Sequence, residues 1–110
     1  MSRIEQVVYG SKGFLPHARA TRALVKFCDD HGSKDSAVQD LRLCLSALEA
    51  GEKSNAIAAF KRVPICKDGF GDWFPPAIPP LETEDYSQAV FEALVERWHR
   101  LMKLLAENTW

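Results

Sequence analysis

Residues 84–108 decide the fold, and they read EDYSQAVFEALVERWHRLMKLLAEN. Apolar side chains recur in this stretch at intervals of three and four residues. They are Tyr86, Val90, Leu94, Trp98, Met102 and Leu105, with Phe91, Val95 and Leu101 beside them. This spacing places them on one broad face of a helix, which at ~1.5 Å per residue is long for a chain of 110 residues. We therefore expect the shorter helices to pack against it.

Three shorter helices are predicted ahead of this stretch. Pro16 suits the first turn of the first helix, because its missing N–H costs nothing there, and Gly32 is a natural stop. The apolar stripe between them consists of Ala20, Ala23, Leu24, Phe27 and Cys28. Residues 1–15 form an irregular N-terminal segment, compatible with either a short strand or the beginning of a helix.

The second and third predicted helices are joined by a very short connection. Ser36 and Gln39 fit a capping box at the start of the second helix, although Asp35 could cap it instead. Gly51 ends the second helix and Pro64 stops the third. The inward positions are Val38, Leu41, Cys44, Leu45 and Leu48, then Ala56, Ile57, Phe60 and Val63. We expect an antiparallel hairpin, with the long helix packed along it, in one all-α domain of four helices spanning residues 1–110.

The composition bounds the class of protein. Hydrophobic residues make up 46% and charged residues 26%, as in a soluble globular domain. The net charge of -1 creates no global field for nucleic acid or an anionic membrane. We see neither an apolar run of ~18 residues nor a signal peptide, so we expect a cytoplasmic protein without a membrane partner. Cys28, Cys44 and Cys66 are an odd, widely spaced set, which indicates reduced core thiols.

Patterns for catalysis and metal binding are missing. His17, His31 and His99 do not lie four residues apart, and no two cysteines form a C-x-x-C pair. Neither a nucleotide-binding glycine loop nor a G-x-S-x-G motif occurs. Since the carboxylates are dispersed among lysines and arginines, we predict no enzyme activity, no metal and no cofactor.

The segment before the long helix, residues 65–83, reads ICKDGFGDWFPPAIPPLET and holds four of the six prolines. The prolines should keep this Gly/Pro/aromatic loop ordered, and Thr83 can cap the long helix. We expect Trp73 and Phe74 to fold back onto the bundle, with exposure at an interface as the alternative. Phe70, between two glycines, is the expected exposed anchor. The acidic side chains around these aromatics are Asp68, Asp72, Glu82, Glu84 and Asp85.

Two charge patterns on the first helix point to partners. Asp29 and Asp30 end the helix, where negative charge opposes its dipole. We therefore expect them to pair either with a basic group of a partner or with a lysine nearby. Arg19, Arg22 and Lys26 share one stripe that could touch phosphates. A solvated outer face is the interpretation we favour for this stripe, because the two aspartates would repel a nucleic-acid backbone.

The run GFGDWFPP at residues 69–76, with Glu82, Thr83 and Tyr86, VFEAL at 90–94, and Trp98, resembles small helical bacterial proteins of unknown function. Some of these are similar to immunity proteins encoded beside polymorphic toxins of the Rhs and contact-dependent types. The resemblance covers the C-terminal third to half of the chain. In relatives the glycine-rich loop is longer and often carries a methionine where Phe70 stands here.

The resemblance implies a cytoplasmic immunity protein that covers the active site of a cognate toxin and has no chemistry of its own. The expected partner-binding residues are Asp68, Phe70, Asp72, Trp73, Glu82, Glu84 and Asp85, with Asp29 and Asp30. A net charge near zero argues for a toxin other than a basic nuclease, or for local complementarity. Two alternatives stay open: a nucleic-acid-associated regulator using the basic stripe, and an oligomeric scaffold in which Trp98 and Trp110 pack between copies.

Overall fold

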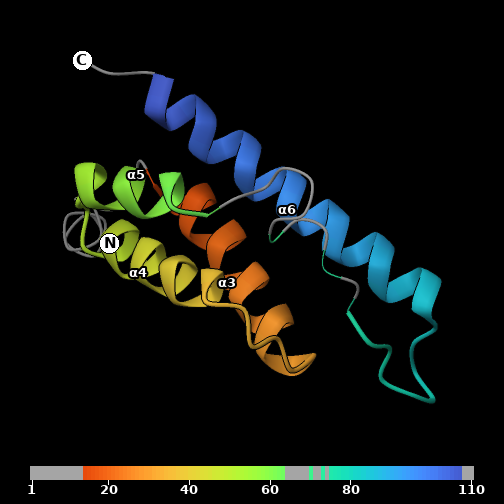
Figure 1. Ribbon diagram of the computed structural model, residues 1–110. Coiled ribbons are helices and arrows are strands. Elements are labelled where there is room, and N and C mark those ends of the chain that lie inside the picture. Colours follow the sequence, from red (N-terminus) through yellow and green to blue (C-terminus); the bar gives the residue numbers. More distant parts are fainter. Residues whose placement is uncertain (1–13, 64–69, 71–72, 74, 108–110) are drawn as a thin grey trace, which may run out of the picture.

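Figure 1 shows the computed structural model, which describes residues 14–63, 70, 73 and 75–107. This part of the chain contains four helices and no strand. The helices are α3 (Leu15–Asp30), α4 (Ala37–Glu49), α5 (Lys53–Lys61) and α6 (Glu84–Glu107). The prediction of an all-α domain with four helices is confirmed. Residues 1–13, Pro64, Cys66 and Trp110, which carried some of the predictions, lie outside the described residues.

The long helix α6 has 24 residues and begins where a cap was predicted. The hydroxyl oxygen of Thr83 accepts a hydrogen bond from the Tyr86 N–H at 3.2 Å, and the Thr83 carbonyl accepts one from the Ser87 N–H at 3.0 Å. Glu84 and Asp85 occupy the first turn, where negative charge complements the helix dipole. The beginning of α6 is therefore stabilised by its own local sequence.

The other helix boundaries follow from a few local residues. Gly32 and Gly51, which follow α3 and α4, have φ angles of 72° and 74° in the left-handed region that favours glycine. At the start of α4 the Asp35 carboxylate accepts the Ala37 N–H at 2.8 Å, whereas Ser36 makes no capping bond. The capping-box prediction is wrong because Ser36 already has helical backbone angles, so Asp35 caps the helix.

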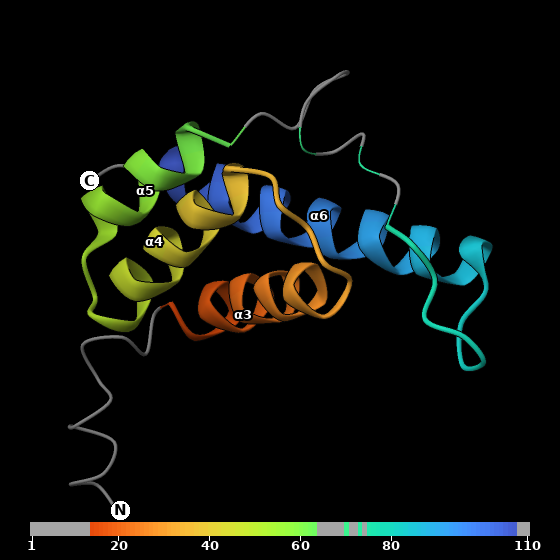
Figure 2. The ribbon, with the colours of Figure 1, turned by 60° about the horizontal axis from the view of Figure 1, so that its bottom comes forward.

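The helices pack as a hairpin and a pair that share α3. α4 and α5 run antiparallel, as predicted, and α3 and α6 also run antiparallel in both views (Figures 1 and 2). α6 packs chiefly against α3 and approaches α5 less extensively, so the expectation that it lies along the α4–α5 hairpin is wrong. α3 takes that place because its buried residues cover a wide face, from Ala18 and Val25 to Ala20 and Phe27, that can contact both α4 and α6.

The core face of α6 is centred on Phe91, Val95, Trp98 and Met102. Val90, Leu94, Leu101 and Leu105 flank this face and are partly buried. Tyr86 is 57% exposed, which corrects its predicted place on the core face. The register puts Ser87 inward instead, and its hydroxyl donates to the carbonyl oxygens of Pro75 and Glu84, each at 3.2 Å.

Trp98 and two cysteines are core residues. Trp98 is fully buried and packs edge-on against Phe60 of α5, with ring centroids 5.4 Å apart. Trp98 is therefore unavailable for contacts between copies, so the scaffold alternative loses one of the two tryptophans on which it was based. Cys28 and Cys44 are buried free thiols, and burial raises their pKa values to about 12 and about 11. Both stay protonated at neutral pH, as expected of core cysteines.

Candidate partner-binding surface

Residues 75–83 form an ordered turn at the end of the molecule where α3 ends and α6 begins (Figures 1 and 2). The N–H groups of Leu81 and Glu82 both donate to the Ile78 carbonyl oxygen at 3.1 Å. In return, the Glu82 carboxylate accepts the Ile78 N–H at 3.1 Å. The Pro79–Pro80 peptide bond within the turn is cis. The three hydrogen bonds close the turn on itself.

A buried histidine forms hydrogen bonds to both this turn and α3. Nε2 of His31 lies 2.8 Å from the Glu82 carboxylate, and Nδ1 lies 2.8 Å from the Phe27 carbonyl oxygen. The imidazole is buried and stacks on the Phe27 ring, with centroids 3.8 Å apart. Both ring nitrogens thus lie within hydrogen-bond distance of oxygen acceptors, so the imidazole links the turn to the last turn of α3.

The Glu82 carboxylate is the acceptor that comes from the turn. The hydrogen bond from His31 is the main cause that lowers the pKa of Glu82, and the bond from the Ile78 N–H adds to it. Glu82 was predicted to contact a partner, but its carboxylate is used inside the molecule. His31 was not predicted as a site residue, since 51 positions separate it from Glu82.

An aromatic cluster packs next to His31, because the Phe27 ring that stacks on the imidazole also contacts Phe91. Phe91 of α6 contacts three rings edge-on or stacked, at centroid distances of 5.3 Å to Phe70, 5.1 Å to Trp73 and 5.9 Å to Phe27. Phe70 is only 1% exposed, so the prediction of an exposed anchor is wrong. Burial of a large ring against Phe91 outweighs the freedom that flanking glycines allow. Trp73 is half-buried and folds back onto the core, as expected, while Phe74 lies outside the described residues.

The exposed apolar side chains near the turn are different from those predicted. Leu81 is 87% exposed, Tyr86 57% and Ile78 39%. They are three of the six large hydrophobic residues that are exposed in the described part of the chain, and all three fall within residues 78–86. We call Ile78, Leu81 and Tyr86 the turn patch. The sequence could have indicated these residues, because Ile78 and Leu81 lie among prolines and acidic residues in the segment that follows the aromatics.

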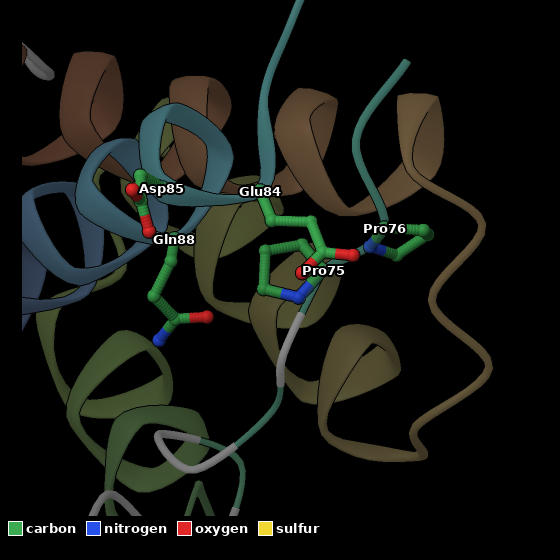
Figure 3. Close-up of a pocket in the computed structure, with 5 residues that line it drawn as sticks. All are labelled: Pro75, Pro76, Glu84, Asp85 and Gln88. Atoms are coloured by element: carbon green, nitrogen blue, oxygen red, sulfur yellow. The ribbon is translucent and has the colours of Figure 1, made fainter. Parts of the chain in front are cut away.

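Beside the turn patch is an acidic hollow of about 380 Å³ (Figure 3). It is lined by Pro75, Pro76, Glu84, Asp85 and Gln88. Glu84 and Asp85 are exposed and form no ion pair with the described residues. The amide nitrogen of Gln88 donates to Glu92 at 3.0 Å, while its oxygen is buried and has no hydrogen-bond partner among the residues described. The hollow therefore offers hydrogen-bond acceptors to a cationic group.

The remaining acidic candidates have other surroundings. Asp30 pairs with Lys26 at 2.9 Å, and Asp29 pairs with Arg42. The alternative of an internal salt bridge is thus correct for both aspartates, although Asp29 uses an arginine rather than a lysine. Asp68 and Asp72 lie outside the described residues.

Within the described ranges, no three His, Cys, Asp or Glu side chains converge in a way that could hold a metal ion. Of the helices described, none is both long and apolar enough to cross a bilayer. No protein-family model, no curated protein and no solved structure matches this chain.

Proposed function

We propose that this chain is a cytoplasmic bacterial immunity protein, which binds a cognate protein toxin directly and covers its active site without chemistry of its own. The turn patch and the neighbouring acidic hollow form the binding surface. The observation that carries the proposal is Leu81, which stands 87% exposed at the tip of a turn that internal hydrogen bonds hold closed.

The rigidity of the turn favours binding. A large apolar side chain that is exposed in isolation gains free energy when a partner removes it from water. The Ile78 carbonyl and the Glu82 carboxylate close the turn, and His31 anchors it, so little conformational entropy is lost on association. Exposed apolar residues held in this way are typical anchors of protein interfaces.

The charge around the turn patch indicates the chemistry of the partner. Glu84 and Asp85 form no ion pair within the part of the chain that the structure describes, and they lie beside Pro75 and Pro76, which suits a lysine or arginine side chain of the toxin. The chain as a whole carries a net charge of only -1, so complementarity would be local rather than a global field. The resemblance over residues 69–105 to immunity proteins supports a toxin as the partner.

The basic stripe on α3 lends little support to the nucleic-acid alternative. Arg22 pairs with Glu49 at 2.8 Å, and Lys26 pairs with Asp30 at 2.9 Å. Two of its three cations are thus partly neutralised within the molecule, which weakens any attraction to phosphates.

The test is co-expression with the toxin encoded beside this gene, followed by calorimetric titration of the purified pair. The wild-type chain should restore growth and bind, and Leu81→Asp should weaken binding by at least ~30-fold, as expected for a hot spot of about 2 kcal/mol. Leu43→Asp is the matched control, because Leu43 is 55% exposed on α4, and it should bind within about threefold of wild type. Failure to rescue growth, or equal loss in both variants, would contradict the proposal.

A further inference from the structure

A second hollow lies between the first half of α3 and the middle of α6. It has a volume of about 160 Å³ and a floor of Ala20, Ala23 and Leu94, between Arg19 of α3 and Arg97 of α6. Leu94 stands ten residues after Glu84, so it is roughly 15 Å along α6 from the turn. The hollow is therefore distinct from the turn patch and the acidic hollow.

The two arginines that border this hollow have no acidic partner among the described residues. Arg19 and Arg97 are exposed and form no ion pair with the residues that the structure describes. Their neighbours differ: Arg22 of α3 pairs with Glu49, and Arg100 of α6 approaches Glu96 at 3.8 Å. Two guanidinium groups on adjacent helices, neither of them ion-paired within the described ranges, thus flank an apolar floor.

The size of the hollow limits what it can hold. Sites for small organic ligands are typically ~300–1,000 Å³, whereas a cavity of ~150 Å³ accommodates benzene. At about 160 Å³ this hollow matches a single aromatic or branched side chain. The floor is made of alanine and leucine side chains, which offer no hydrogen bond to a phosphate or a base.

Each of the two helices also carries an exposed leucine beyond the hollow. Leu15, one turn before Arg19, is 45% exposed, and Leu104, two turns after Arg97, is 53% exposed. Because α3 and α6 run antiparallel, both leucines extend the surface toward the same end of the molecule (Figure 1). A segment of several residues could lie along it, with its main anchor in the hollow.

We propose that this hollow between α3 and α6 is a second docking site. Its occupant is an acidic amphipathic segment of a partner protein, which inserts one large apolar side chain between its carboxylates. The carboxylates would pair with the Arg19 and Arg97 guanidinium groups, which bind them in a bidentate manner. The site does not depend on the proposed toxin-binding surface. It favours protein over nucleic acid because its floor is apolar and the next cation, Arg22, is paired.

The test uses labelled helical peptides of about four turns, with Glu residues flanking a Phe, Leu or Trp anchor, titrated by fluorescence anisotropy. At least one acidic peptide should bind, and replacing its Glu residues by Gln should weaken binding about tenfold. Arg19→Ala and Arg97→Ala should each weaken it several-fold, while the paired Arg22→Ala should change little. Ala23→Leu, at an exposed helix position, should fill the hollow and abolish binding, whereas Ala58→Leu, at an exposed position on α5, should not.

Circular dichroism and melting temperature establish that each variant is folded. The proposal is overturned if no acidic peptide binds, if the Gln peptides bind equally well, or if folded Ala23→Leu retains affinity. It is also overturned if random duplex DNA binds in place of the peptides, with a steep salt dependence that Arg19→Ala removes.

Discussion

The imidazole of His31 meets the Glu82 carboxylate at 2.8 Å, across 51 residues of sequence. Glu82 closes the 78–82 turn through the Ile78 N–H, and His31 is held in place by the Phe27 carbonyl. One carboxylate therefore shapes the exposed turn and ties it to α3. This contact joins the segment that carries the turn patch to the end of α3.

Stability should decline in acid partly because of Glu82. Its pKa in the folded chain lies below the ordinary value of 4.5, so its contribution is complete above that value and is lost as the pH falls through the lower, folded-state pKa. Wild type should therefore melt at a higher temperature than Glu82→Gln near neutral pH, and the difference should shrink below about pH 4.5. A difference that stays constant from neutral to strongly acidic pH would contradict this role.

The burial of Phe70 predicts a large energetic role. Phe70→Ala should lower the free energy of unfolding by ~3–5 kcal/mol, because it leaves a cavity against Phe91. Tyr86→Ala, at an exposed position, should change it by less than ~0.5 kcal/mol. Urea denaturation measures both values. A loss below about 1 kcal/mol for Phe70→Ala would show that the ring is not packed in the core.

The end of α3 depends on a glycine. Gly32 has a φ angle of 72°, and an added Cβ would meet nothing within 4 Å, so only backbone strain opposes a side chain there. Gly32→Ala should cost ~1–2 kcal/mol, whereas Gly32→Asn should cost less because asparagine tolerates the left-handed region. Thermal and urea unfolding would show the order. Equal costs for the two variants would be inconsistent with it.

Two adjacent residues at the start of α4, Asp35 and Ser36, should differ in their contribution to stability. Asp35→Ala should cost ~1 kcal/mol, since its carboxylate caps the Ala37 N–H, and Ser36→Ala should be nearly neutral. Chemical denaturation of the two single variants tests the assignment. The reverse order would restore the capping box of Ser36 and Gln39.

Local signals in the sequence predicted most helix boundaries. Gly32, Gly51 and Thr83 act within one turn of their own positions, and helical periodicity placed Phe91, Val95 and Trp98 inward. Such effects need no knowledge of distant residues.

The predictions that were wrong concern contacts between segments that are distant in the sequence. Phe70 is buried because α6 brings Phe91 to it, and no local pattern contains that contact. In the same way, His31 becomes a site residue only when the turn places Glu82 beside it. The packing of α6 chiefly against α3, rather than along the α4–α5 hairpin, also depends on which helix faces meet in the folded chain.

The most direct measurement is hydrogen exchange of the isolated protein and of its complex with the neighbouring toxin. We expect binding to slow exchange in peptides covering residues 76–88, and to leave the exposed face of α4 around Leu43 unchanged. Protection confined to α4 and α5, with residues 76–88 exchanging as in the free protein, would contradict the assignment of the turn as the toxin-binding surface.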